Sequence, residues 1–217
     1  LVTGHCFGRP VDCYLYGHTG QQGWYDDYGW NAARSGWRHT LAQSRAIASR
    51  PGDLLSISCG NGFGGSPGLK YRGMYWPEGV QEAAACALWI PGWKDWPVAL
   101  QQRERNHLPP MIAGNAVKKD RGWADCQLCV LNGVRICVVG LAAPDDALCY
   151  LDNTLGRVQL LEPVEAVGRM ISSIRASQPD VVVLVTAMDP DGRALNRHVL
   201  RRLIKRFPEI DLIMSPG

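Results

Sequence analysis

Short apolar runs alternate with longer segments in which apolar residues recur every three or four positions, most clearly in the second half of the chain. One such segment predicts a helix over Leu161 to Ser177. The β-branched run Asp180 to Thr186 follows, and its unbroken hydrophobicity is typical of a strand covered on both faces. A second helix is predicted over Arg193 to Phe207, before another apolar run at 209–214. This alternation predicts an α/β fold.

The first half of the chain repeats this order around a glycine-rich segment. Helical patterns over Arg38 to Arg50 and over Glu78 to Trp89 flank an apolar run that begins at Asp53 and ends at Cys59. Four of the next six residues are glycines. Ligands of open α/β sheets bind beyond the carboxyl ends of the strands, where glycines let the backbone approach closely. We therefore expect a site there.

A β-hairpin is predicted by the dipeptide Asn132-Gly133, which is flanked by the apolar stretches Cys126 to Leu131 and Val134 to Leu141. The hairpin also determines how Cys126-Gln127-Leu128-Cys129 is interpreted. Side chains three positions apart in a strand point to opposite faces, so these two thiols cannot chelate one ion together. Separate core cysteines are the favoured interpretation over a zinc half-site or a redox pair.

Composition limits the classes of protein that fit. The length of 217 residues with 46% hydrophobic content fits one domain, residues 1–217. The longest apolar run, Val181 to Val185, is too short for a transmembrane segment. The net charge is only +3, and the basic cluster Arg201 to Arg206 is interpreted as a solvated helix face, because no aromatic platform for nucleic acid accompanies it.

Eight cysteines are many for a cytosolic domain of this size, which favours a periplasmic or extracellular location. Leu1 lies inside a predicted strand, so we expect that a leader or anchor preceded it. Cys6 and Cys13 are seven positions apart in a segment with Gly8 and Pro10, and we predict that they form a disulfide. A metal site built on them would need further ligands, for which only His5 and His18 are near.

The segment from about 14 to 37 is rich in aromatic residues and shows neither period. We interpret it as a long insertion, either a surface loop packed on itself or a protein interface, since Tyr and Trp are enriched at interfaces. The residues proposed as interface anchors are Trp24, Tyr25, Tyr28 and Trp30.

The order of residues from Gly60 to Pro67 resembles the metallophosphoesterases of the 5′-nucleotidase (calcineurin-like) type, in which a strand ends in Gly-Asp before a Phe-x-Gly-Ser-Pro-like segment. This resemblance implies a sandwich of two mixed β-sheets flanked by helices. It also implies an N-terminal domain without the nucleoside-binding domain of the nucleotidases.

The same resemblance assigns metal-ligand positions to residues that bind metals poorly. Asn61 corresponds to an aspartate that bridges two metal ions. In the first motif, Asp-x-His-Gly, alignment on Gly8 places His5 at the aspartate and Phe7 at the histidine.

The later motifs of the family depart in the same way. Ala187 corresponds to a metal-binding histidine, and Ser215-Pro216-Gly217 replaces a Gly-His-x-His segment. Where the family has Gly-Asn-His-Glu, the chain has Pro91 to Trp96. The positions interpreted as vestigial are therefore His5, Phe7, Asn61, Ala187 and Ser215.

Three functions fit these observations. The first is a non-catalytic domain that serves as an accessory or binding subunit, with protein partners and with neither a metal nor another cofactor. The second is a phosphoester hydrolase with a rebuilt metal site using His5, Cys6, Asn61, Asp95 or Asp189. The third is a redox or metal-binding protein that uses Cys6, Cys13 and Cys59. Because every ligand position is altered, the first is the favoured hypothesis, and we do not expect an enzyme.

Overall fold

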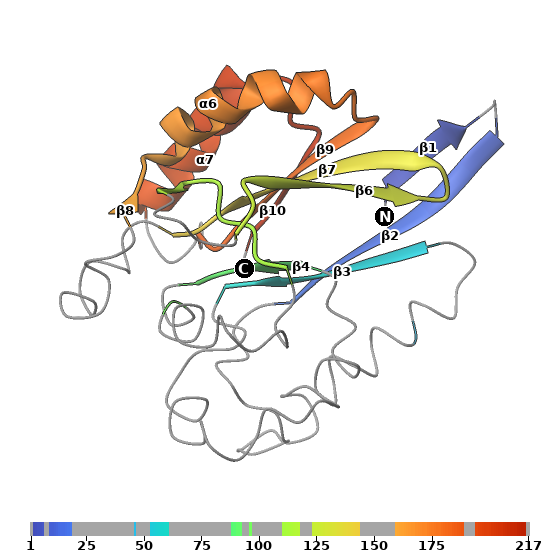
Figure 1. Ribbon diagram of the computed structural model, residues 1–217, viewed down its shortest axis with the longest axis horizontal. Helices are drawn as coiled ribbons and strands as arrows, with labels where there is room; N and C mark the ends of the chain where they lie inside the picture. The colour runs from blue at the N-terminus through green and yellow to red at the C-terminus, as the bar shows by residue number, and fades with distance from the viewer. Residues whose placement is uncertain are drawn as a thin grey trace, which may run out of the picture.

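The structure is a computed structural model, which describes residues 2–6, 9–18, 46, 53–60, 88–92, 96, 110–117, 123–143, 159–188 and 194–215. Within these ranges, two four-stranded sheets and two long helices form successive layers (Figure 1). None of the described helices combines the length and the apolar character needed to cross a membrane.

The first sheet has the strand order β1-β2-β3-β4. Its strands are β1 (Val2–Cys6), β2 (Arg9–His18), β3 (Asp53–Cys59) and β4 (Leu88–Ile90). The last three run parallel to one another, whereas β1 is an antiparallel edge strand. The first sheet is therefore mixed.

The second sheet has the order β10-β9-β7-β6. It contains β6 (Cys126–Leu131), β7 (Val134–Leu141), β9 (Val181–Thr186) and β10 (Leu212–Met214). Here β6 is the antiparallel strand and the other three are parallel. A small additional sheet pairs β5 (Ala116–Val117) with β8 (Gln159–Leu160). The predicted α/β sandwich of two mixed sheets is confirmed.

Two helices cover the outer face of the second sheet, as Figure 1 shows. They are α6 (Pro163–Ala176) and α7 (Ala194–Arg206). The carboxylate of Glu162 caps α6 by accepting a hydrogen bond from the Glu165 N–H at 2.9 Å, and Pro163 begins the helix. Both helices lie within the ranges predicted from their apolar period.

Strand β7 shows how the two cores are built. Its alternate side chains point to opposite faces, so Ile136 and Val138 enter the core between the sheets while Cys137 and Val139 enter the core beneath the helices. The core between the sheets also receives Leu55, Ile57 and Cys59 of β3. The second sheet is thus covered on both faces, which explains the continuous hydrophobic run of β9.

The hairpin of β6 and β7 has the bounds predicted from the sequence. Asn132 and Gly133 connect the strands with φ angles of 48° and 82°. Positive φ at both central residues is the requirement of a type I′ turn, which matches the twist of the flanking strands.

Two predicted boundaries need correction. Tyr14 and Tyr16 lie in β2, opposite Leu54 and Ser56 of β3, so the strand occupies the beginning of the expected aromatic insertion. The helical pattern over 78–89 ends in a strand, because Leu88 and Trp89 belong to β4. Of the helix predicted over 38–50, only Ala46 is described, and it is helical.

Candidate functional site

The parallel strands of both sheets end at one side of the sandwich, which we call the strand-end edge. Its described residues are Cys59, Gly60, Ile90, Pro91, Leu141, Thr186, Ala187 and Ser215. This is the position at which α/β sheets bind ligands. The chemistry of the edge therefore depends on the side chains that these residues carry.

A buried hydrogen bond joins the two sheets at this edge. The thiol of Cys59 donates to the backbone oxygen of Thr186 at 2.8 Å, and Cys59 is 4% exposed. The hydroxyl of Thr186 in turn accepts a hydrogen bond from the Met188 N–H at 3.1 Å. These polar atoms are committed to internal bonds, which hold the two sheets together.

Asn115 fixes the loop beside the edge. Its side-chain amide donates to the oxygen of Ala142 at 2.8 Å, and its side-chain oxygen accepts from the Ala142 N–H at 2.9 Å. The side chain is fully buried. The backbone next to Asn115 also contacts β7, because the Gly114 N–H donates a hydrogen bond to the Gly140 oxygen at 2.8 Å. Asn115 therefore has a structural role in clamping this loop onto β7.

Two of the predicted vestigial positions lie at the edge. Ala187 follows β9, donates its N–H to the Leu141 oxygen at 3.0 Å and packs against both hydrophobic cores. Ser215 follows β10 and is exposed. A methyl group cannot bind a metal ion, and a serine hydroxyl is not among the usual ligands of zinc.

His5 lies elsewhere in the sheet. His5 lies opposite Pro10 of β2. Pro10 comes three positions before Cys13, and Cys13 lies opposite Asp53, the first residue of β3. His5 is thus at the end of the sheet where β3 begins, about 30 Å along the strands from the edge. Phe7 and Asn61 lie outside the described residues.

His18 is a residue that the sequence did not place. Because β2 runs parallel to β3, the backbone of His18 lies opposite Ser58, next to Cys59 and the strand-end edge. Sequence reasoning considered His18 only as a neighbour of the first cysteines. His18 could have been placed if the strand had been predicted to its full length, Arg9–His18. Tyr14 and Tyr16 were instead assigned to the aromatic insertion.

The register of the β1–β2 hairpin also separates the two cysteines of the predicted disulfide. Cys6 lies opposite Arg9, and Cys13 lies opposite Val2. The two cysteines are therefore four positions apart along the ladder, or about 13 Å. A disulfide joins Cα atoms less than about 7 Å apart, so this pairing does not accommodate a Cys6–Cys13 bond.

The other cysteines of the second sheet occupy both faces of β6, as predicted. Cys126 packs against the core beneath the helices, and Cys129 packs against the core between the sheets. The pKa of Cys137 is raised, mainly by a hydrogen bond with the Cys126 thiol and then by burial. Burial also raises the pKa of Cys129. Since the thiolate is the reactive form, these buried or partly buried thiols fit a structural role.

The described residues of the edge do not fit a site for two metal ions. Such a site needs several carboxylate and imidazole ligands on neighbouring loops. The described edge offers no carboxylate: it has the Cys59 thiol, already used as a donor to Thr186, the hydroxyls of Thr186 and Ser215, and backbone oxygens, and the backbone of His18 lies beside it. Across the described ranges, no group of three His, Cys, Asp or Glu side chains is placed to hold a metal ion.

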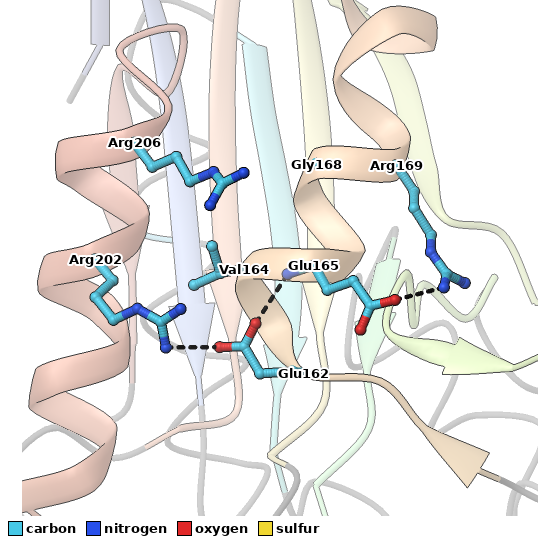
Figure 2. Close-up of a pocket in the computed structure, with 7 residues that line it drawn as sticks. All are labelled: Glu162, Val164, Glu165, Gly168, Arg169, Arg202 and Arg206. Atoms are coloured by element: carbon cyan, nitrogen blue, oxygen red, sulfur yellow. Dashed lines mark hydrogen bonds and ion pairs between the residues drawn. The ribbon is translucent and has the colours of Figure 1, made fainter.

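Charged side chains gather instead in a groove of about 370 Å³ between α6 and α7. Figure 2 shows the residues that line it. It is lined by Glu162, Val164, Glu165, Gly168, Arg169, Arg202 and Arg206. One ion pair crosses the groove from α7 to the start of α6, and a second lies along α6. Arg202 contacts Glu162 at 3.2 Å, and Arg169 contacts Glu165 one turn away on α6. The third cation, Arg206, lies with its guanidinium carbon 5.9 Å from the centre of the Phe207 ring.

No protein-family model and no curated protein sequence matches the chain. Solved structures do. The calcineurin-like phosphoesterase YfkN of Bacillus subtilis matches with a TM-score of 0.73 and 15% identity, over 93% of this chain and 70% of that chain. The sulfate thiohydrolase SoxB of Thermus thermophilus matches with a TM-score of 0.67 and 14% identity, over 97% of this chain and 49% of that chain.

A 5′-nucleotidase precursor of Thermus thermophilus matches with a TM-score of 0.58 and 18% identity, over 70% of this chain and 31% of that chain. The matches thus span from about a third to about two thirds of these longer proteins. At such identities they establish the fold and leave the activity open. The chain has the calcineurin-like metallophosphoesterase fold that the segment around Gly60 to Pro67 led us to expect.

Proposed function

We propose, from the calcineurin-like phosphoesterase fold of this chain, that it is a non-catalytic accessory or binding subunit of a larger extracytoplasmic assembly. In this fold, catalysis would rely on metal ions at the strand ends that stabilise the attacking and leaving oxygens. The proposal is that this chain keeps the framework of the fold and lacks the ligands on which that chemistry depends.

The observation that carries the proposal is the position of Ala187. It directly follows β9, where the resemblance implies a metal-binding histidine, and its side chain packs against both hydrophobic cores. An imidazole in this place would have to displace packed apolar groups, because protein interiors contain few voids. The residue at the end of β9 therefore packs against the hydrophobic cores, at a position where the resemblance implies a metal ligand.

The neighbouring contacts support the same proposal. Cys59 joins the sheets through Thr186, and Asn115 ties the adjacent loop to Ala142. These bonds make the strand-end edge a rigid part of the framework. A rigid domain with such an edge is suited to holding or presenting a partner, for which preorganised surfaces give the largest gain in affinity.

Metal content and phosphatase activity test the non-catalytic part of this proposal. Protein purified and incubated with zinc, manganese or iron is analysed for bound metal, and hydrolysis of 5′-AMP and p-nitrophenyl phosphate is measured. We expect less than one metal ion per chain and no turnover. Two metal ions per chain together with turnover would overturn the proposal.

An Ala187→His variant sharpens this measurement. The described residues of the edge include no Asp or Glu, so a single histidine returned to the end of β9 would lack the carboxylate ligands of a two-metal site, and we expect neither stoichiometric metal binding nor activity. An Ala187→Phe variant controls for the added bulk. If Ala187→His alone restored stoichiometric metal binding, an almost complete metal site would be present, and the non-catalytic assignment would fail.

The accessory role is tested through partner association. Trp24 and Trp30, which with Tyr25 and Tyr28 lie outside the described residues, are the proposed anchors, because Trp and Tyr are enriched among the residues that dominate binding energy at interfaces. We expect a Trp24→Ala/Trp30→Ala variant to lose the partners that the wild-type chain retains in a native pull-down from its source, with little change in Tm. A large fall in Tm with partners retained would show that the two indoles belong to the domain's own core.

A further inference from the structure

All of the charged side chains of α7 are basic. The helix contains no acidic residue, and its buried side chains are Asn196, Val199, Leu200 and Leu203. With about 100° between successive residues, these four occupy one side of the helix. The exposed residues that face directly away from them are Arg197, His198, Arg201, Arg202 and Lys205. We call this set the basic face.

Within the basic face, Arg197, Arg201 and Lys205 form a column. They are spaced four residues apart, which places consecutive charges about 6 Å from one another along the helix. Like charges at this spacing destabilise a helix by a few tenths of a kcal/mol per pair. The repulsion between Arg201 and Lys205 is relieved when the carboxylates of a partner neutralise these two side chains.

The groove between the helices continues this surface. Arg202 and Arg206 point from α7 toward α6 in Figure 2 and line the same hollow as Gly168. Arg202 is already paired with Glu162, whereas no carboxylate within the described residues is paired with Arg206. Gly168 leaves the wall of the groove without a side chain. An anionic side chain of suitable size can therefore enter beside Gly168 and reach Arg206.

We propose that the basic face and the adjoining groove bind an acidic polypeptide segment of a partner protein. Carboxylates spaced like those of an acidic helix match Arg201 and Lys205, and one further carboxylate enters the groove next to Arg206. This gives a partner chemistry to the proposed accessory role, on which the inference rests.

A protein partner fits this surface better than a membrane. The exposed apolar residues Leu195 and Ile204 are 55% and 60% accessible, and they are nine positions apart. Nine positions are two and a half turns, so the two side chains point in opposite directions and flank the basic face. A flat bilayer cannot receive both of them, whereas a polypeptide lying along the helix can contact either one.

Nucleic acid fits less well for a different reason. The residues that line the groove include no aromatic side chain on which a base could stack. A polypeptide needs no such platform, because its carboxylates contact the exposed cations directly. An acidic polypeptide is therefore the ligand class that this surface favours.

Binding of a fluorescein-labelled decaglutamate peptide to the full chain tests the proposal by fluorescence anisotropy. At about 20 mM ionic strength the Debye length is roughly 20 Å, so the full charge of the basic face acts on the peptide. We expect saturable binding that weakens at least about tenfold in an Arg201→Gln/Lys205→Gln variant. Removing two exposed like charges leaves the fold intact, which an unchanged or slightly higher Tm verifies.

A Gln127→Glu/Val130→Glu variant is the matched control, because it lowers the net charge by the same two units on β6, at the opposite edge of the second sheet from β10. We expect it to bind the peptide nearly as well as the wild-type chain. Equal losses in both double variants would show that only net charge matters and would overturn the assignment to α7. Absence of saturable binding to the wild-type chain would also overturn it.

A Gly168→Gln variant tests the groove separately. A Cβ at position 168 would lie 3.7 Å from the nearest atom of the Phe207 ring, an ordinary contact, so the helix accepts the side chain while the groove is filled. We expect peptide affinity to fall about threefold to tenfold. Unchanged affinity would remove the groove from the proposed surface.

Two competing ligands complete the test. Vesicles of phosphatidylserine and phosphatidylcholine, and a single-stranded oligothymidine, are titrated under the same conditions. Tighter binding of either one than of decaglutamate would overturn the choice of an acidic polypeptide. Peptide binding requires neither metal nor phosphatase activity, so a failure here leaves the non-catalytic proposal standing, and a catalytically active chain leaves this inference standing.

Discussion

The strand-end edge and the groove between α6 and α7 differ in how their polar groups are used. At the edge, polar atoms are buried and bonded internally, as in the contact of Cys59 with Thr186 and that of Asn115 with Ala142. In the groove, Arg202 and Arg206 are exposed, and they lie on a helix without acidic residues. The edge is where α/β folds bind ligands in general, yet its described residues include no Asp, Glu, Lys or Arg, whereas several of these residues line the groove.

Within the described residues, the edge and the groove thus contribute differently to the domain. Packing and internal hydrogen bonds preserve the edge, because changing them costs stability. Exposed charges cost little stability in either direction and are available for a partner. Substitutions at the edge should therefore change stability strongly, whereas substitutions at the groove should change stability weakly.

The largest effect is expected for Gly140→Ala, at the packed edge. A Cβ at this position would lie 2.7 Å from both the backbone oxygen and the Cγ2 atom of Ile112, and the backbone cannot give way cheaply. We expect a loss of about 2–4 kcal/mol in the free energy of unfolding, measured by urea denaturation. A loss smaller than about 1 kcal/mol, the average effect of a point mutation, would show that the edge is less tightly packed than we infer.

Asn115→Ala should rank next. The change removes both side-chain hydrogen bonds to Ala142 and leaves its N–H and its oxygen buried without these partners. We expect a loss of about 2–3 kcal/mol, checked by the same denaturation experiment. Asn115→Asp serves as the comparison, since it keeps the acceptor for the Ala142 N–H and loses the donor. Equal stability of wild type and Asn115→Ala would contradict a clamping role.

Gly168→Ala should act in the opposite direction to Gly140→Ala, although the substitution is the same. Position 168 lies on the exposed side of α6 and has room for a Cβ. Alanine favours the helix by lowering the entropy of the unfolded chain, so we expect a gain of about 0.5–1 kcal/mol and a rise in Tm of about 1–4 °C. A fall in Tm would mean that the groove cannot accept even a methyl group, and the Gly168→Gln test would lose its basis.

The smallest effect is expected for Glu209→Gln. The hydrogen bond from Arg175 holds the pKa of Glu209 below its ordinary value of 4.5. A carboxylate with a lowered folded-state pKa stabilises the fold above its unfolded pKa, and this contribution is lost as the pH falls through the folded-state pKa. Wild type should therefore be slightly more stable than Glu209→Gln at pH 7, and the difference should disappear at low pH.

Thermal denaturation of wild type and Glu209→Gln between pH 3 and pH 7 measures this difference, with the range chosen to enclose roughly the ordinary carboxylate pKa. Both groups of the pair are near the surface, so salt should reduce the effect at pH 7. If the stability difference between wild type and Glu209→Gln grew as the pH was lowered, the predicted direction would be wrong, and another titrating group would control the difference.

Much of the second half of the fold was predictable because its signals are local. The period of the apolar residues in α6 and α7 and the Asn132-Gly133 dipeptide act over a few neighbouring residues, and the structure confirms each of these elements. The opposite faces of Cys126 and Cys129 follow from the same local geometry.

The positions of site residues were less predictable, because they depend on pairing between distant strands. His5 was assigned to the strand-end edge from a motif, and the antiparallel pairing of β1 with β2 places it at the other end of the sheet. Ala187 was placed correctly at the end of β9, since the helix and strand that precede it are strongly patterned. The groove between α6 and α7 left no signal, because its walls come from two separate helices.

Residue identity and local period were therefore enough to establish the types of the main elements, the hairpin turn and the absence of standard ligands at Ala187 and Ser215. Tertiary packing was needed to establish the bond between Cys59 and Thr186, the clamp of Asn115 and the union of Gly168 with Arg202 and Arg206 in one groove. The physical reason is that each of these contacts joins segments far apart in the chain, whose pairing is set by the packing of the whole domain.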